Sequence, residues 1–319
     1  MSPRTAGEIG EFALIASFTE GLTPSAQVPV GPGDDAAVIR PHGDLVISTD
    51  AMVQDTHFRT SWSGPHDVGR KAVASAVADI EAMGARPVAI VVALSVPADV
   101  VEEWLAEFSR GVRAEADLAG VSLAGGDLTR GPVISAAVTA LGDLDGAAPV
   151  LRSGARPGNV VAVTGRLGMA GAGLAVLGRG FRSPGAVVRA HRVPEVPYGQ
   201  GVLAREAGAT SLIDCSDGLL ADLGHVAEAS RVTIDLTAGA FEVDEAQKTV
   251  AAAIGGGDPL TFILTGGDDH ALIGTFARAE DLPPGWRIIG RVTAAAAVPA
   301  VTVDGAAWEG DDTPGWHHF

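Results

Sequence analysis

Aspartates that flank short apolar runs are the feature that most constrains how this chain folds. The runs lie at 36–39, 45–47, 88–96, 121–124, 133–141, 160–163, 212–213 and 232–236, and Gly, Pro and Asp bound the first two of them. Short apolar segments with such boundaries are typical of β-strands. The sequence therefore predicts many strands, several of which carry carboxylates at their ends.

Segments with helical spacing of apolar residues separate these runs. They lie at 8–22, 66–83, 98–118, 168–177 and 217–229, and their spacing predicts helices with an apolar face. The first half of the chain is then a strand-rich α+β domain with two long helices. The second half alternates strands and helices, which predicts an α/β layered architecture.

Residues 143–159 mark a change of composition between the two halves. This stretch is rich in Gly, Pro and Ala and has no strand or helix periodicity, as is typical of a domain boundary. A chain of 319 residues also exceeds the usual ~100–200 residues of one domain. We predict two domains, 1–148 and 149–319, that share a cleft.

The charge balance is strongly acidic and narrows the range of partners. The chain has 22 basic and 39 acidic residues and a net charge of −17, which repels nucleic acid and anionic membranes. A single cysteine cannot form an internal disulfide, no signal-peptide pattern is present, and the apolar stretch 87–96 is too short to span a bilayer. We expect a soluble, cytoplasmic protein in which metal ions bridge any anionic substrate.

Several aspartates and two hydroxyl side chains surround two neighbouring predicted strands. Asp34 and Asp35 precede the first strand, and Ser48, Thr49 and Asp50 follow the second. Carboxylate and hydroxyl oxygens at strand ends are the hard ligands that Mg²⁺ prefers, with waters and substrate phosphates completing its shell. The alternative is that these aspartates only cap turns.

Two further aspartates lie in apolar or glycine-rich surroundings. Asp79 lies inside the apolar helix 66–83, where a buried carboxylate needs a metal or an arginine as its partner. The alternative is an exposed helical position. Asp127 follows a glycine pair in a predicted turn at 125–131, where glycine lets backbone N–H groups approach a phosphate. A hairpin turn with Asp and Gly for geometric reasons is the alternative there.

The sharpest single motif is Ile-Asp-Cys-Ser-Asp-Gly-Leu at 213–219, at a predicted strand-to-helix junction. Ser216 or Asp217 is expected to cap the helix, whose N-terminus suits a phosphate. The second carboxylate, Asp214, exceeds what capping needs. Cys215 is interpreted as a buried small residue, because the sequence identifies no histidine partner that would activate it.

Two more polar positions are candidates for substrate contacts. The stretch Gly267-Asp268-Asp269-His270 either presents a carboxylate to a cationic group of a substrate or only forms a turn. Among the eight histidines, His57 is the most notable because it lies just beyond the first acidic strand. A scattered histidine is more often structural, and that alternative stays open.

Lysine is nearly absent, which restricts how this chain can bind a nucleotide. The only lysines are Lys71 and Lys248, and neither follows a glycine. A Walker-type phosphate loop and the protein-kinase signature set are therefore both missing. If ATP binds, metal ions held by carboxylates must neutralise its phosphates.

The motifs together resemble those of the thiamine-monophosphate kinase family, within the aminoimidazole-ribonucleotide-synthetase-like superfamily. The resemblance rests on the order and spacing of 33–37, 48–50, 78–80 with 83–85, 125–129, 214–218 and 315–319, and it runs nearly end to end. It implies an N-terminal domain that binds ATP and Mg²⁺ and whose sheet pairs with that of a second subunit in a dimeric β-barrel. It also implies a C-terminal α/β domain that closes the active site.

The resemblance further implies a reaction and a set of site residues. The reaction is ATP-dependent phosphorylation of thiamine monophosphate to thiamine diphosphate by direct in-line transfer. Several Mg²⁺ ions would be held by Asp34, Ser48, Thr49, Asp50, Asp79, Asp127, Asp214 and Asp217. ATP would contact Gly126, Asp127, Arg152 and Ser216, and thiamine monophosphate would contact His57, Asp268 and Trp316. Catalysis would be metal-assisted through Asp50, Asp127 and Asp217, without a certain catalytic side chain.

The chain departs from the family pattern at 267–270. Gly-Asp-Asp-His replaces the usual Gly-Glu-Asp-Tyr, so the carboxylate of Asp268 is one methylene shorter. Trp308 is an alternative to Trp316 as the aromatic residue that stacks on thiamine. Two other functions stay open as alternatives. One is another ATP-using synthetase of the same superfamily, and the other is a non-catalytic protein that binds metal or nucleotide.

Overall fold

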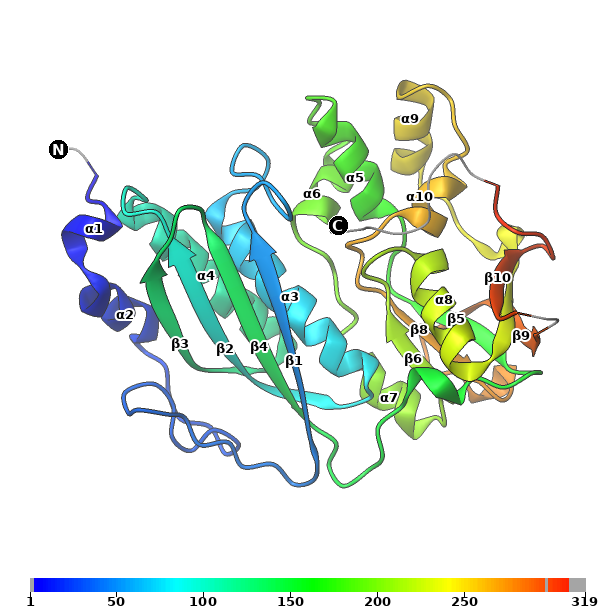
Figure 1. Ribbon diagram of the computed structural model, residues 1–319, viewed down its shortest axis with the longest axis horizontal. Coiled ribbons are helices and arrows are strands. Elements are labelled where there is room, and N and C mark those ends of the chain that lie inside the picture. Colours follow the sequence, from blue (N-terminus) through cyan, green and yellow to red (C-terminus); the bar gives the residue numbers. More distant parts are fainter. Residues whose placement is uncertain (1–2, 296–297, 310–319) are drawn as a thin grey trace. The chain divides into compact units, whose positions relative to one another are not determined.

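The computed structural model describes residues 3–295 and 298–309 and divides the chain into two compact units (Figure 1). The first unit consists of Met1–Ile80 and Arg86–Ala147, and the second of Glu81–Ala85 and Ala148–Phe319. Each unit combines a sheet with helices, in agreement with the predicted mixed α/β class. Among the described residues, no helix has the length and apolar character needed to cross a bilayer.

The first unit is built on a four-stranded sheet with the order β1-β4-β2-β3. Its strands are β1 (Leu45–Val53), β2 (Arg86–Val96), β3 (Ser122–Arg130) and β4 (Ser135–Asp143). β4 pairs antiparallel with β1 and β2, and β2 pairs parallel with β3. A parallel pair needs a long crossover connection, which α4 (Glu102–Ala119) supplies. β1 and β3 are therefore the two edge strands.

Side chains on β1 alternate between the two faces of this sheet. α3 (Pro65–Ala82) and α4 lie on one face (Figure 1). Met52 is buried on that face, and Ser48 reaches α3 from it. Ile47 and Ala51 are exposed on the opposite face. The predicted helices at 66–83 and 98–118 are confirmed, and among the described residues the opposite face of β1 stays exposed from Leu45 to Ala51.

The segment before β1 packs on the sheet without joining it. Ala37 and Ile39 pack against buried residues of β2 and β3. The predicted strand at 36–39 is nevertheless wrong, because Val38 makes only one isolated bridge, donating its N–H to Val30 O at 2.9 Å. The segment is held by its side chains, and its backbone forms no ladder.

Two other sequence predictions in this unit need correction. The helix predicted at 8–22 is interrupted, because Gly10 adopts a φ of 84° between α1 (Ala6–Ile9) and α2 (Glu11–Thr19). The turn predicted at 125–131 is mostly strand, since β3 continues to Arg130. A Cβ on Gly126 would clash with Val92 O on β2. Glycine at this position thus permits close pairing of two strands and does not form a turn.

The second unit contains a six-stranded sheet with the order β10-β7-β9-β5-β8-β6. Its strands are β5 (Val160–Thr164), β6 (Ser211–Asp214), β7 (Val232–Leu236), β8 (Leu272–Phe276), β9 (Arg287–Ala294) and β10 (Ala300–Val303). β10 and β7 are parallel, and the other pairs are antiparallel. The strands predicted at 160–163, 212–213 and 232–236 are confirmed. β8 and β9 were missed because Gly274 and Gly290 interrupt their apolar runs.

Helices cover both faces of this second sheet. They are α5 (Met169–Gly178), α6 (Gly185–Arg192), α7 (Gln200–Glu206), α8 (Leu219–Ser230), α9 (Glu245–Ala253) and α10 (Leu260–Thr265). Val163 and Ile213 point into the core formed with α8 and α10, while their strand neighbours Ala162 and Leu212 point into the core formed with α7. Burial on both faces fixes the end of β6 against the start of α8, where the conspicuous motif at 213–219 lies.

Candidate active site

Ser48 and Asp79 are in direct contact in the first unit. Ser48 lies on β1 and Asp79 on α3, and Ser48 Oγ donates a hydrogen bond to Asp79 Oδ2 at 2.5 Å. Asp79 is partly exposed, whereas its helix neighbours Ala78 and Ile80 are fully buried. The helix therefore presents this carboxylate to β1. The contact brings together two residues that the sequence predicted as ligands of the same metal ions.

Asp50 lies on the same face of β1 as Ser48, because it is two residues further along the strand. Its side chain is half-buried, and its Oδ1 accepts a hydrogen bond from the N–H of Ala51 at 3.1 Å. This bond is local and turns the carboxylate along the strand. Asp50, Ser48 and Asp79 therefore form one group of oxygen donors between β1 and α3, which we call the first acidic group.

Thr49 lies apart from this group, and Asp34 makes a local contact of its own. Thr49 points to the opposite face of the sheet, where its Oγ1 lies 3.1 Å from Oγ1 of Thr139. Asp34 lies on an exposed loop, and its Oδ1 accepts a hydrogen bond from the N–H of Asp35 at 2.9 Å. The structure thus separates the hydroxyl of Thr49 from that of Ser48, and the roles of Thr49 and Asp34 as ligands stay predictions.

Asp127 lies at the other edge of the same sheet. β4 and β2 separate β3 from β1, so Asp127 and Asp50 are about 14 Å apart at the usual strand spacing. Asp127 pairs in register with the exposed Ala93, and its neighbour Leu128 is buried. Its side chain therefore points to the face opposite Asp50. Since Mg²⁺–oxygen bonds are about 2.1 Å long, these two carboxylates of one chain do not share an ion.

His57 follows β1 in a tight turn that fixes its ring. The Nδ1 accepts a hydrogen bond from the N–H of Val53 at 3.0 Å, and the N–H of His57 donates to Val53 O at 2.9 Å. A neutral imidazole whose Nδ1 accepts carries its proton on Nε2. The buried Lys71 of α3 donates to the carbonyl of His57 at 3.5 Å. His57 is thereby held at the end of β1 with Nε2–H as a donor.

Two loops of the second unit lie back to back. One follows β6 (214–218) and the other follows α10 (266–271). They exchange three backbone hydrogen bonds of 2.8 Å, from Cys215 N to Ala271 O, from His270 N to Cys215 O and from Asp268 N to Ser216 O. A Cβ on Gly267 would clash with Ser216 O, so this close approach requires glycine. Two motifs that the sequence presents separately therefore form one structural feature.

Asp214 and His270 form a buried pair at these loops. His270 Nδ1 lies 2.9 Å from Asp214 Oδ2, and the two side chains are only 6% and 4% exposed. The sequence singled out Asp214 but not His270. In the sequence, His270 is notable only because it follows two aspartates in a predicted turn. That position does not identify Asp214, more than fifty residues away, as its partner.

Asp222 accepts hydrogen bonds from the backbone N–H groups that precede α8. The predicted cap at Ser216 or Asp217 is wrong. The helix begins two residues later than predicted, after Gly218, without a capping side chain at that position. Asp222 Oδ2 accepts hydrogen bonds from the N–H groups of Asp217 at 3.2 Å and Gly218 at 3.0 Å. Burial, and then the charges of Asp214 and Asp217, raise the pKa of Asp222 to about 7. The side chain of Asp222, inside the first turn of α8, thus holds the loop before the helix, and the helix begins at Leu219.

Asp269 holds the start of α5 from the second of the two loops. It is buried and accepts hydrogen bonds from the N–H groups of Gly168 and, at 3.0 Å, Ala170. Burial raises the pKa of Asp269 to about 7 in spite of these bonds. On either side, Asp268 and His270 adopt φ values of 65° and 52°. Such a conformation is uncommon outside glycine and is maintained where the surroundings impose it.

The raised pKa of Asp269 predicts a pH dependence of stability. The folded pKa of about 7 exceeds the ordinary value of 3.8, so the unfolded chain releases this proton first. The stabilisation by protonated Asp269 is complete below about pH 4 and is lost as the pH rises to about 7. In Asp269→Asn we expect the free energy of unfolding to fall less steeply between pH 5 and pH 8. We also expect it to be lower by about 1–2 kcal/mol, because one amide oxygen replaces two carboxylate oxygens.

Urea unfolding from pH 5 to pH 8 measures this slope. Glu206→Gln, which neutralises an exposed carboxylate on α7, is the matched control and should keep the slope of the unmodified protein. An unchanged slope in Asp269→Asn would contradict the effect of burial on this carboxylate.

Cys215 and Arg152 are two further residues whose surroundings the structure describes. Cys215 is fully buried, as interpreted from the sequence, and burial raises the pKa of its thiol well above the ordinary value. The carbonyl of Arg152 accepts a hydrogen bond from Ser230 Oγ at 2.7 Å, at the end of α8. Arg152 therefore lies beside the C-terminal end of α8, and its predicted contact with ATP stays a prediction. Trp316 lies outside the described residues.

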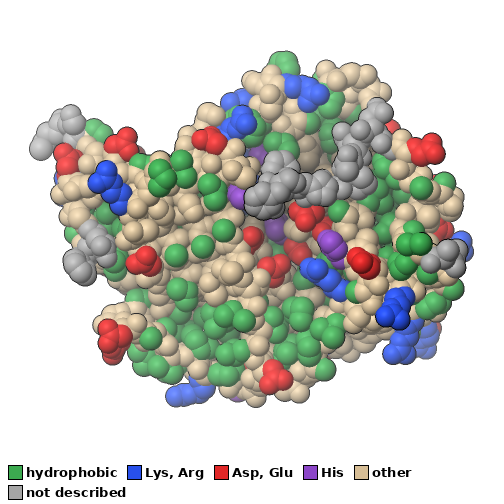
Figure 2. Space-filling model, viewed as in Figure 1, with side chains coloured by type: hydrophobic (Ala, Val, Ile, Leu, Met, Phe, Trp, Pro, Cys, Tyr) green, Lys and Arg blue, Asp and Glu red, His purple; other side chains and the backbone are tan. Residues whose placement is uncertain are grey.

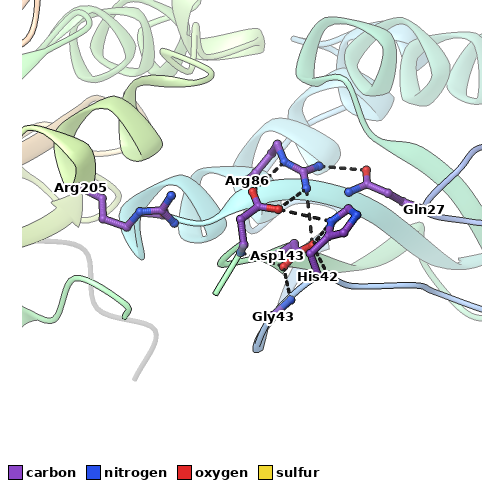
Figure 3. Close-up of polar contacts among 8 residues, drawn as sticks. Gln27, His42, Gly43, Arg86, Asp143 and Arg205 are labelled. Carbon is purple, nitrogen blue, oxygen red and sulfur yellow. Dashed lines mark hydrogen bonds and ion pairs between the residues drawn. The ribbon is translucent and has the colours of Figure 1, made fainter. Parts of the chain in front are cut away.

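A further group of His and Asp side chains surrounds Asp143 in the first unit (Figure 3). Asp143 is buried and accepts hydrogen bonds from the N–H groups of His42, Gly43 and Asp145 at 2.7 to 3.1 Å. Arg86 lies 3.5 Å from Asp143 and 2.9 Å from Asp145. Although burial alone would raise the pKa of Asp143, these N–H groups lower it. The guanidinium already neutralises the carboxylate, which anchors the connection before β1 to the end of β4.

The donor atoms in both units suit a hard divalent cation. The first acidic group offers one hydroxyl and two carboxylates, and the loop after β6 offers Asp214 and Asp217. Oxygen donors of this kind favour Mg²⁺ over softer metals. Burial, and then the charges of Asp214 and Asp217, raise the pKa of Asp222, and a bound cation would offset those charges.

Two sequence families match consecutive parts of the chain. Residues 33–144 match the family described as AIR synthase related protein, N-terminal domain. Residues 156–301 match the family described as AIR synthase related protein, C-terminal domain. Together these matches cover most of both compact units.

Curated relatives align with the chain over almost its whole length. It is 48% identical over 316 residues to the thiamine-monophosphate kinase of Mycobacterium tuberculosis H37Rv, covering 99% of this chain and 93% of the relative. It is 40% identical over 325 residues to the thiamine-monophosphate kinase of Corynebacterium glutamicum, covering 99% and 95%.

Solved structures give the same relationship at the level of the fold. The thiamine-monophosphate kinase of Stenotrophomonas maltophilia K279a superposes with a TM-score of 0.78 at 32% identity, over 92% of this chain and 95% of that one. A structure described as AaThiL complexed with AMPPCP and TMP has a TM-score of 0.78 at 30% identity, over 98% of both chains. The hydrogenase maturation protein HypE shares the fold at 20% identity, with a TM-score of 0.72.

Proposed function

The chain belongs to the thiamine-monophosphate kinase family, and we propose that carboxylates of both units hold the Mg²⁺ ions that its reaction requires. It is an ATP-dependent phosphotransferase that converts thiamine monophosphate to thiamine diphosphate. The observation that carries this function is the 48% identity with a curated thiamine-monophosphate kinase over 99% of the chain. The related structure with AMPPCP and TMP supports both substrates.

Two groups of oxygen donors are the proposed metal ligands. In the first unit they are Ser48, Asp50 and Asp79, supported by the 2.5 Å contact between Ser48 and Asp79. In the second unit they are Asp214 and Asp217. The remaining proposed ligands are Asp34, Thr49 and Asp127. When bound, Mg²⁺ would neutralise the phosphate charges and support in-line displacement.

The proposed substrate contacts follow from the same assignment. Gly126, Asp127, Arg152 and Ser216 would contact ATP, and His57, Asp268 and Trp316 would contact thiamine monophosphate. The Nε2–H of His57 is a suitable donor, because Val53 occupies Nδ1. Asp268 is presented by a left-handed backbone and offers a carboxylate to a cationic group of thiamine.

Transfer between two phosphates depends on positioning and charge neutralisation. The acceptor oxygen of thiamine monophosphate is already ionised at neutral pH, so a general base is not required. Cys215 is fully buried and does not serve as a nucleophile. The N-terminus of α8 offers backbone N–H groups and a positive dipole end that suit a phosphate. The residues of this chain thus hold and orient the two substrates for direct transfer.

A homodimer is part of the proposal, with the open face of the first sheet as its surface. Leu45 and Ile47 on β1 are 45% and 68% exposed, and Figure 2 shows hydrophobic side chains gathered over the lower part of this unit. A second copy that covers this face would form the dimeric barrel that the family resemblance implies. Edge-to-edge pairing of the two sheets would also bring the partner's Asp127 beside Thr49 on the open face of β1, across the strand from the first acidic group, so that one active site would draw on both subunits.

Mg²⁺ should stabilise the protein through these ligands. A ligand that binds only the folded state stabilises it by about 2.7 kcal/mol at a hundredfold excess over its Kd, which is about 5 °C in melting temperature for a chain of this size. In Asp79→Asn we expect this Mg²⁺-dependent rise to fall by at least half, because a ligand of the first acidic group is lost. Asp117→Asn, at an exposed position of α4, should leave it intact. Equal rises in Asp79→Asn and the unmodified protein would count against the assignment.

A coupled assay of ADP formation tests the function against its alternatives. With ATP and Mg²⁺, thiamine monophosphate should give ADP at a substrate-dependent rate, and a purine precursor should give none. A synthetase of the same superfamily would show the reverse. A non-catalytic metal-binding protein would bind Mg²⁺ and form no ADP.

A further inference from the structure

We propose that His270 is a positioning residue that orients Asp214 for metal binding. The inference rests on the proposed role of Asp214 as a Mg²⁺ ligand. It goes further by giving a function to a position at which this chain departs from the usual Gly-Glu-Asp-Tyr turn of the family. The proposal is carried by the contact between the two side chains and by the backbone that holds the histidine.

The imidazole fixes one oxygen of Asp214 and leaves the other available. His270 Nδ1–H donates to Asp214 Oδ2 at 2.9 Å. Both side chains are almost completely buried, so water does not compete for this bond. Among the described residues, no hydrogen bond reaches Oδ1 of Asp214. The carboxylate is thus held in one orientation with one oxygen ready to accept a cation.

The backbone determines where the imidazole lies. His270 has a φ of 52°, and its N–H donates to Cys215 O at 2.8 Å. The N–H of Cys215 in turn donates to Ala271 O at 2.8 Å. A left-handed residue that is not glycine is maintained only where its surroundings impose it. Two bonds to the residue after Asp214 therefore lock the histidine beside that carboxylate.

Neighbouring charges make such an orienting bond necessary. Asp217 and Asp222 lie in the same loop and helix start as Asp214, where Asp222 Oδ2 accepts hydrogen bonds from the N–H groups of Asp217 and Gly218. Repulsion among these carboxylates would turn Asp214 away from the others in the absence of a cation. The N–H of His270 opposes that rotation. Removing a partner that orients a metal ligand typically weakens metal affinity about 10–100-fold.

The experiment compares two amides at position 270. In His270→Asn the side-chain N–H lies where Nδ1 lies in histidine, whereas in His270→Gln it lies closer to the place of Nε2. We expect His270→Asn to bind Mn²⁺ within about threefold of the unmodified protein, and His270→Gln to bind it about 10–100-fold more weakly. Mn²⁺ alone, titrated by electron paramagnetic resonance without ATP or thiamine monophosphate, is the probe. Asp214→Asn identifies which of the titrated ions belongs to this site.

Kinetics give a second readout that a packing defect would not reproduce. His270→Gln should raise the Mg²⁺ concentration needed for half-maximal rate, while kcat at saturating Mg²⁺ stays within about threefold of normal. Equal Mn²⁺ affinity in His270→Gln and the unmodified protein would overturn the proposal. So would an equal loss of Mn²⁺ affinity in the Asn and Gln variants. Because the titration contains no substrate, these outcomes are separate from a failure of the kinase assay, which would contradict the proposed function itself.

Discussion

Asp50→Asn is expected to lower kcat by about 10²–10³-fold while the protein stays folded. Asp50 lies half-buried on β1 and, within the part of the chain that the structure describes, makes a local hydrogen bond to Ala51, so the substitution opens no cavity. Asn keeps the size of the side chain and removes its charge. The charge is what the proposed metal ion requires next to Ser48 and Asp79. The measurement is kcat at saturating ATP, thiamine monophosphate and Mg²⁺, with circular dichroism as a check of folding.

Asp44→Asn is the matched control for this substitution. Asp44 is exposed directly before β1, so its neutralisation changes the net charge equally at the same edge of the sheet. We expect its kcat to stay within about twofold of normal, as for most surface substitutions. Near-normal kcat in Asp50→Asn at saturating Mg²⁺ would refute the role of Asp50.

A mixture of Asp50→Asn and Asp127→Asn is expected to regain activity that neither variant has alone. If the partner's Asp127 serves the same active site as Asp50, a mixed dimer contains one site with both substitutions and one intact site. Random exchange makes half of the dimers mixed, so activity should return to about a quarter of normal. The physical reason is the separation of about 14 Å between Asp50 and Asp127 within one sheet.

The control for the mixing experiment pairs Asp50→Asn with Asp79→Asn. Both residues lie in the first acidic group of one chain, so every site of a mixed dimer remains defective and activity should not return. Subunit exchange is verified by purifying mixed dimers through two different affinity tags. Mixed dimers of Asp50→Asn and Asp127→Asn without activity would show that Asp127 acts within its own chain or not at all.

Long periodic segments were predictable from the sequence. The helix predicted at 66–83 corresponds to α3 at Pro65–Ala82, and the strand predicted at 88–96 lies within β2. In both segments the apolar pattern is continuous and is bounded by Gly or Pro. The contact between Ser48 and Asp79 was not predicted in this form, since the sequence argument named a metal or an arginine as the partner of a buried Asp79.

Glycines and candidate helix caps predicted the local structure less well, because residues distant in the sequence decide which conformation they adopt. Gly126 was expected in a turn, but it lies in β3, where the backbone of β2 leaves no space for a side chain. Asp222 caps α8 from inside the helix, although Ser216 and Asp217 are better placed in the sequence. In each case a contact outside the local segment decided the conformation.

The placement of Thr49 and His270 shows two different limits. Strand alternation already separates Thr49 from Ser48 and Asp50, so this signal was present in the sequence once β1 was accepted as one continuous strand. His270 depends on two loops that meet through backbone hydrogen bonds across more than fifty residues. No periodicity or local motif encodes that meeting, and only the folded structure reveals it.

The fate of the γ-phosphoryl group tests the central claim most directly. The protein is incubated with Mg²⁺, thiamine monophosphate and ATP that carries ¹⁸O in its γ-phosphoryl oxygens. The ¹⁸O content of each product is then measured by mass spectrometry. Direct transfer predicts that the label appears in the terminal phosphate of thiamine diphosphate, with one ADP formed per thiamine diphosphate. Label recovered in inorganic phosphate, without labelled thiamine diphosphate, would contradict it.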